Sequence, residues 1–111
     1  MPSLSTGLVI AGAYADKLRR TLFAQLKDDV KNGKLTSQEV ARAAAEMNQL
    51  LYQIFVDDLK LDKGDVVRVR VEYDVEDGNI KWRLNTLTVE AFKRMSDDEI
   101  QETVKKRLES A

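Results

Sequence analysis

Four cations and one tryptophan alternate with apolar residues between Val66 and Val89. The cations are Arg68, Arg70, Lys81 and Arg83, and the aromatic residue is Trp82. Guanidinium and ammonium groups along a groove can hold phosphates, and an indole face can stack on a base, which is worth about 1 to 3 kcal/mol. This combination of side chains indicates the chemistry of single-stranded nucleic-acid binding.

Further candidates lie on the first predicted helix and the first predicted strand. Tyr14 and Tyr73 offer two more aromatic faces, while Lys17 and Arg20 flank Arg19 in a basic step. The alternative interpretation of this step is a solvated helix face, because basic residues are mostly exposed.

The composition excludes several kinds of chemistry. The 111 residues suffice for one domain, 1–111, that buries about two-thirds of the surface of its unfolded chain. The chain has no cysteine and no histidine, which excludes disulfides, thiol nucleophiles, Ser-His pairs and imidazole metal ligands. The acidic pairs at 57–58 and 97–98 fit helix ends, where charge complements the helix dipole. We therefore expect no enzyme and no cofactor.

The overall charge provides no general attraction for a polyanion. There are 18 basic and 19 acidic residues, a net charge of −1, so nucleic-acid binding needs a local basic patch. High charge and few amides are typical of heat-adapted proteins. No apolar run approaches the roughly 20 residues of a membrane span, and a signal-peptide pattern is absent. We expect an intracellular, cytoplasmic protein.

The first predicted helix runs from about Thr6 to Lys31. Apolar residues recur there in steps of three and four, and Asn32 and Gly33 end the helix. The consecutive apolar residues 8–10 leave an extended start as the alternative.

The second predicted helix begins at Ser37 and runs to about Leu59. Thr36 followed by Glu39 forms a capping box at its start. Because the connection between the helices is short, they must form an antiparallel hairpin over about 6–60.

A β-hairpin is predicted over about 65–92. Asp77-Gly78 between alternating runs is typical of a tight two-residue turn. Counting outward from this turn gives the facing pairs Val75–Ile80, Asp74–Lys81, Tyr73–Trp82, Glu72–Arg83 and Val71–Leu84. Trp82 then lies on the apolar face, where it can stack on a base only if that face opens into a cleft.

The same register governs the remaining arginines. Arg70 comes opposite Asn85 and Arg68 opposite Leu87, so neither is expected to face an acid. A shift in the apolar alternation predicts a bulge near Asn85 and Thr86. The alternative role of these arginines is solubility and protection of a sheet edge.

A last helix is predicted over about 96–109, capped by Ser96. Its narrow apolar stripe of Ile100, Val104 and Leu108 could serve self-association. Two strands make an inadequate sheet, so we expect extra pairing from the amino-terminal segment or a second subunit, and a homo-oligomer, dimer or tetramer. The fold class is α+β, an antiparallel helical hairpin packed on an antiparallel β-hairpin or sheet and followed by a short helix.

Three features in this order resemble a known family. They are the opening LSTGLVIAGAYADKLRRTLFAQL, the capped second helix and the RVRVEYDV…IKWRLNTLTVE hairpin. Together they span about Leu4 to Lys93 and resemble the ThermoDBP-related archaeal family, non-canonical single-stranded DNA-binding proteins of heat-loving archaea. The resemblance implies a fold other than the OB-fold, an apolar and aromatic cleft flanked by cations, and oligomers that enclose the strand. The last helix is too short for the long coiled coil of the founding member.

These observations favour a sequence-nonspecific single-stranded DNA-binding protein that acts as an oligomer. The alternative is a structural or adaptor protein that docks protein partners through its hairpin edge and last helix. No motif announces contact with a 2′-hydroxyl, so RNA stays open as a partner beside DNA.

Overall fold

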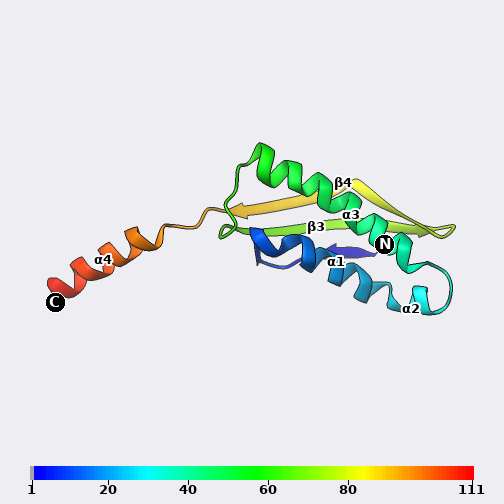
Figure 1. Ribbon diagram of the computed structural model, residues 1–111, viewed down its shortest axis with the longest axis horizontal. Coiled ribbons are helices and arrows are strands. Elements are labelled where there is room, and N and C mark those ends of the chain that lie inside the picture. The colour runs from blue at the N-terminus through cyan, green and yellow to red at the C-terminus, as the bar shows by residue number, and fades with distance from the viewer. Residues whose placement is uncertain (1) are drawn as a thin grey trace.

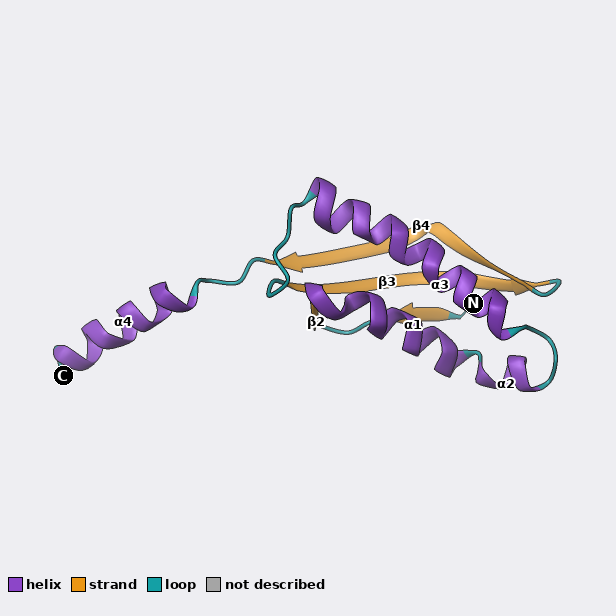
Figure 2. Cartoon of the chain, in the orientation of Figure 1, coloured by secondary structure: helices purple, strands orange, loops and turns teal. Residues whose placement is uncertain are grey.

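The computed structural model describes residues 2–111 as an elongated molecule of 66 × 27 × 21 Å (Figure 1). The elements, in order, are β1 (Ser3–Ser5), β2 (Val9–Ile10), η1 (Ala11–Ala13), α1 (Tyr14–Gln25), α2 (Lys27–Lys31), α3 (Ser37–Tyr52), η2 (Gln53–Asp58), β3 (Val66–Glu76), β4 (Asn79–Phe92) and α4 (Asp97–Glu109). Helices α1 and α3 cover one face of an antiparallel sheet, and α4 projects away from both layers (Figure 2). The predicted α+β class is confirmed.

Strand β3 is the centre of the sheet. It pairs with β4 on one side and with the short strands β1 and β2 on the other, always antiparallel. The amino-terminal segment therefore supplies the extra pairing that the hairpin needs. Strand β4 is paired on one side among the described residues, which makes it an edge of the sheet.

The predicted helical start at Thr6 is wrong, and the extended alternative is correct. The Thr6 backbone N–H donates to the Val69 carbonyl at 3.0 Å, and the Thr6 hydroxyl accepts from the Val69 N–H at 3.0 Å. This buried threonine pairs with both backbone polar groups of Val69 in the gap between β1 and β2. Gly7 then turns the chain with a φ of +64°. Regular α-helix begins only at Tyr14.

The predicted helix caps are confirmed. Thr36 Oγ1 accepts from the Glu39 N–H at 3.0 Å, and Ser96 Oγ accepts from the Glu99 N–H at 3.1 Å. These bonds satisfy donors that a helix start leaves unpaired. The six-residue π-helical segment η2 extends α3 to Asp58.

The core lies between the helices and the covered face of the sheet. Its largest fully buried residues are Leu18, Leu22, Val40, Met47, Leu51 and Phe55 from the helical side, and Leu4, Val67, Val69, Val71, Tyr73 and Ile80 from the sheet. Each buried side chain of this size contributes about 1.5 to 3 kcal/mol. Burial alternates along β3, so the other face of the sheet stays uncovered. We call it the open face.

The hairpin register matches the prediction from the turn to Glu72 and then departs from it. Val75–Ile80, Asp74–Lys81, Tyr73–Trp82 and Glu72–Arg83 are paired as predicted. The ladder then shifts, so that Arg70 faces Thr88 and Arg68 faces Glu90; the predicted pairs Val71–Leu84, Arg70–Asn85 and Arg68–Leu87 are wrong.

The predicted bulge is the cause of this shift, and Thr86 secures it. The Thr86 hydroxyl accepts from the Glu72 N–H at 2.9 Å and donates to the Arg83 carbonyl at 2.6 Å. The alternation of apolar residues along a strand predicts where a bulge lies, but it does not predict how many residues the bulge contains.

Glu39 connects α3 to the tip of the hairpin. Its carboxylate accepts from Arg42 at 2.7 and 2.8 Å and from the Ile80 backbone N–H at 2.8 Å. The Arg42 hydrogen bonds, followed by the Ile80 N–H, lower the pKa of Glu39 from 4.5 to about 2. The ionised carboxylate therefore holds the hairpin tip against the helix.

We predict that Glu39→Gln destabilises the fold in a pH-dependent way. Because the folded pKa lies below 4.5, the stabilisation is fully present above that pH and is lost as the pH falls toward about 2. The substitution should lower the free energy of unfolding by about 1 to 3 kcal/mol at neutral pH and flatten its decline between those pH values. Urea titrations followed by circular dichroism measure both effects. Glu46→Gln is the control, since Glu46 is 58% exposed, and an equal loss there would contradict the assignment.

Candidate nucleic-acid interface

The structure distributes the predicted site residues over three surfaces and the core. Arg68, Arg70 and Arg83 lie on the open face of the sheet with Lys81, by the pairing of β3 with β4. Trp82 lies beside α3 at the β4 edge. The remaining candidates are Tyr73 of β3 and Tyr14, Lys17 and Arg20 of α1.

Two arginines of the open face are already paired with acids. Arg68 donates to both carboxylate oxygens of Glu90, at 2.8 and 2.9 Å, which raises the pKa of Arg68 and lowers the pKa of Glu90. Arg83 forms an ion pair with Asp74 at 3.3 Å. The prediction that Arg68 faces no acid is wrong, because the bulge brings Glu90 into register with it.

Arg70 and Lys81 are the exposed cations of the open face that form no ion pair among residues 2–111. Ser5 and Thr88 are the cross-strand neighbours of Arg70 on either side. A guanidinium between two hydroxyl-bearing residues can present several donors to one phosphate. Arg70 is thus the best-placed candidate for a phosphate contact on this face.

A groove of about 510 Å³ lies between α3 and the tip-proximal part of β4. Its lining residues are Arg42, Glu46, Met47, Leu50, Asn79, Ile80, Lys81, Trp82 and Leu84. Five of these nine residues are apolar, and Arg42, Glu46 and Lys81 are the charged ones. Its position at the β4 edge makes it continuous with the open face through Lys81.

Trp82 forms one wall of this groove and is partly buried. Its indole N–H donates to the Ala43 carbonyl at 2.8 Å, and its ring meets the ring of Tyr73 edge to face with centroids 5.5 Å apart. The inward orientation expected from the register is confirmed, and the apolar face opens here beside the helix. Because the indole is already held in place, it can contact a planar base without a further loss of side-chain conformational entropy.

Several groove residues escaped the sequence analysis. Met47 and Leu50 belong to the apolar stripe of α3, where nothing distinguishes a groove wall from a core position. Leu84 is 57% exposed because the bulge removes it from its expected pairing with Val71. Arg42 had one signal, its helical spacing from Glu39, but its position beside β4 depends on the Ile80 carbonyl to which it donates at 3.0 Å.

The two candidate tyrosines lie in the core. Tyr14 meets Phe55 edge to face at 4.9 Å, and burial raises its pKa. Tyr73 is 1% exposed and donates its hydroxyl proton to Gln25 at 2.8 Å. Neither ring presents a face on which a base can stack.

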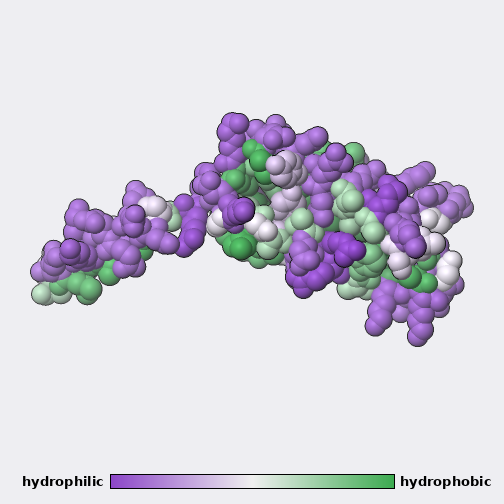
Figure 3. Space-filling view, viewed as in Figure 1, coloured by the Kyte–Doolittle hydropathy of each residue, from purple (hydrophilic) through white to green (hydrophobic). Residues whose placement is uncertain are grey.

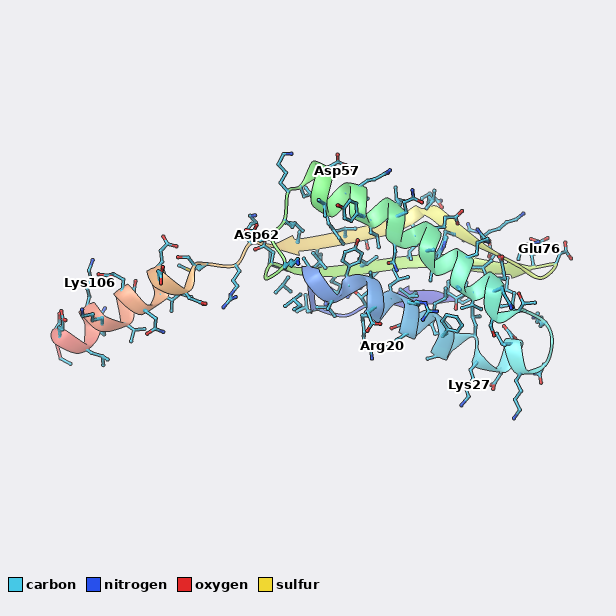
Figure 4. The ribbon with its side chains drawn as sticks, viewed as in Figure 1. Arg20, Lys27, Asp57, Asp62, Glu76 and Lys106 are labelled. Atoms are coloured by element: carbon cyan, nitrogen blue, oxygen red, sulfur yellow. The ribbon has the colours of Figure 1, made fainter. Side chains whose placement is uncertain are left out.

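Lys17 and Arg20 lie on the helical side of the molecule. Both line a shallow hollow of about 480 Å³ on α1, and Arg20 forms an ion pair with Asp16 at 2.8 Å. Figure 4 shows Arg20 pointing outward from α1. The structure does not bring these two residues together with the cations of the open face.

The described part of the chain shows neither a cluster of acidic residues suited to a metal ion nor a helix long and apolar enough to cross a membrane. The side chains of the groove and the open face can supply stacking, apolar contact and hydrogen bonds from cations and hydroxyls.

Solved structures of similar proteins share this architecture. One is apeThermo-DBP-RP2 bound to ssDNA dT10, at 45% sequence identity and a TM-score of 0.93 over 99% of this chain. Our chain spans 50% of the length of that protein. Another is pfuThermo-DBP-RP1 (crystal form II), at 36% identity and a TM-score of 0.76, where 98% of this chain aligns with 74% of the other.

Comparisons of the sequence give a consistent result. No curated protein matches the chain. A family model described as ThermoDBP-related, archaea, matches residues 4–81, which extend from within β1 through β3 to the first residues of β4. The resemblance seen in the sequence is thereby confirmed, and the chain belongs to the ThermoDBP-related family of archaea.

Proposed function

We propose that this protein binds single-stranded DNA without sequence preference, as a homo-oligomer and with no enzymatic activity. Bases enter the groove between α3 and β4, and phosphates run past Lys81 onto the open face to Arg70. The observation that carries this proposal is the similar protein of nearly the same fold that is bound to ssDNA dT10. The groove supplies its physical basis in this chain.

The lining of the groove suits bases of any identity. Leu50 and Leu84 contribute apolar surface, and Trp82 contributes an aromatic surface. Every base has a π-face, so stacking and apolar contact tolerate all four bases. The proposed lack of sequence preference follows from this kind of contact.

The charges of the open face indicate that base contacts carry most of the affinity. Glu90 and Asp74 neutralise Arg68 and Arg83, which leaves Arg70 and Lys81 for phosphates. For single strands, the logarithm of the binding constant falls with the logarithm of salt concentration with a slope of about −0.7 per neutralised phosphate. Two available cations therefore give a slope of about −1.4 per subunit.

Trp82 provides a direct measurement, because it is the single tryptophan of the chain. We predict that its fluorescence changes on titration with dT10. Leu84→Ala, at a residue 57% exposed, should weaken binding with the fold retained. Trp82→Phe should bind detectably, whereas Trp82→Ala should lose about 5- to 150-fold in affinity. Unchanged affinity in both Leu84→Ala and Trp82→Ala would refute the groove as the base site.

Arg70 provides the test of the phosphate path. We predict that Arg70→Ala weakens dT10 binding and makes the salt slope less steep by about 0.7. Arg20→Ala is the matched control, because Arg20 is paired with Asp16 on the helical side. Anisotropy titrations at several salt concentrations measure both quantities. An equal loss of dT10 affinity in the two variants would contradict this path and indicate that the DNA contacts α1.

Competition experiments test the nature of the polymer. We expect unlabelled single-stranded DNA to displace labelled dT10 and duplex DNA to fail, because paired bases cannot enter the groove. A single-stranded RNA competitor measures any preference between the two sugars. Efficient competition by duplex DNA would show that phosphates alone are recognised.

A further inference from the structure

The open face carries acids as well as cations. Glu72, Asp74 and Glu90 lie on the same side of the hairpin as the arginines and Lys81. A protein binds a nucleic-acid backbone by neutralising phosphates with Lys and Arg, so every cation already held by an acid is one fewer for the ligand. The placement of these acids therefore bears on how many phosphates the face can hold.

Glu90 occupies Arg68 in the way that a phosphate would. Its two carboxylate oxygens accept from Nε and Nη2 of Arg68, at 2.8 and 2.9 Å. This edge of a guanidinium presents two parallel donors, and it is the edge that binds either a carboxylate or a phosphate through two oxygens. Glu90 and a DNA phosphate therefore cannot occupy it at the same time.

The surroundings of this ion pair favour an oxyanion. The hydrogen bonds from Arg68, together with the charge of Arg70 nearby, hold the pKa of Glu90 below its usual value. An apolar row crosses the sheet on the other side of the pair and consists of Ile10, Val66 and Phe92. Figure 3 shows hydrophobic residues gathered at this end of the body, from which α4 leaves. Apolar neighbours reduce the screening of charges, so the two arginines form a site for one oxyanion, and Glu90 fills it.

The second ion pair of the open face is built differently. Arg83 reaches Asp74 through Nη1, at 3.3 Å, and its Nε is buried without a hydrogen-bond partner among residues 2–111. The two-donor edge of Arg83 is therefore not open to a ligand, and the removal of Asp74 would not expose it. Arg68 differs in that a phosphate could take over both of the donors that an acid now holds.

We infer that Glu90 is an intramolecular competitor of DNA phosphates at Arg68 and limits the number of phosphates that the open face holds. This inference rests on the proposed function, because it requires single-stranded DNA to cross the open face. With Arg68 occupied, binding draws more of its free energy from bases in the groove and less from phosphates. Such binding is less sensitive to salt than binding by a fully cationic sheet.

The substitution Glu90→Gln tests this competition, because it removes the charge and nearly preserves the shape of the side chain. Glu90 is 44% exposed and lies on the edge strand β4, so the fold should be retained. We expect tighter dT10 binding and a salt slope that changes from about −1.4 to about −2.1, since one further phosphate is neutralised. The affinity ratio of variant to native protein should grow about fivefold for each tenfold dilution of salt. Anisotropy titrations measure both quantities, and circular dichroism checks the fold.

Glu72→Gln is the matched control. It removes the same charge from the same face, but Glu72 forms no ion pair among residues 2–111. Its salt slope should stay at about −1.4, because the substitution exposes no further arginine. An equal steepening in the two variants would show that only the net charge of the face matters, and it would overturn the inference.

Arg68 provides the second test. Adding Arg68→Ala to Glu90→Gln should return the salt slope to about −1.4, because the additional phosphate needs this guanidinium. A slope that stays steep in the double variant would place the additional phosphate elsewhere and overturn the inference.

The outcomes separate the inference from the proposed function. If the native protein binds dT10 and Glu90→Gln binds it with the native slope, the ion pair serves only the stability of the sheet and the inference alone fails. If neither the native protein nor any variant binds dT10 at low salt, the proposed function fails and the inference fails with it.

Discussion

The one-sided burial of β3 is the constraint on which the rest of the structure depends. Its valines and Tyr73 alternate with charged residues, so only one of its faces can enter a core. Both long helices must then lie on that face, and the short amino-terminal strands must complete the sheet beside it. The same alternation leaves a face that no described element covers. The face proposed to contact phosphates is therefore a direct consequence of how the core is built.

The sequence predicted those features of this arrangement that neighbouring residues determine, and it predicted less well those that depend on residues far apart in the chain. The Asp77-Gly78 turn and the caps at Thr36 and Ser96 are local, and the structure confirms them because their geometry is set within a few residues. The pairing of Arg68 with Glu90 was missed because the register beyond a bulge depends on Thr86. The extended amino-terminal segment was predicted only as an alternative to a helix, because Thr6 acts through the distant backbone of Val69.

The candidate site shows the same limit. Sequence alternation identified Trp82 and the cations of the open face, and their common hairpin is confirmed. It could not separate Tyr14, which fills the core, from Trp82, which lines a groove, because both occupy apolar positions of regular elements. It predicted an acid opposite Arg83 but not that the ion-pair partner is Asp74, and it missed the pairing of Arg68 with Glu90. Composition gives the number of charges, whereas the fold decides which of them meet a ligand.

The attachment of the hairpin tip to α3 has a thermodynamic consequence for any ligand in the groove. Glu39 holds the Ile80 backbone, and Ala43 holds the Trp82 indole, so two consecutive turns of one helix fix the same short piece of strand. The conformational entropy of this wall is lost when the chain folds and is not lost again on binding. A flexible strand entering the groove then bears the ordering cost alone, so affinity should respond more to the stiffness of the nucleic acid than to that of the protein.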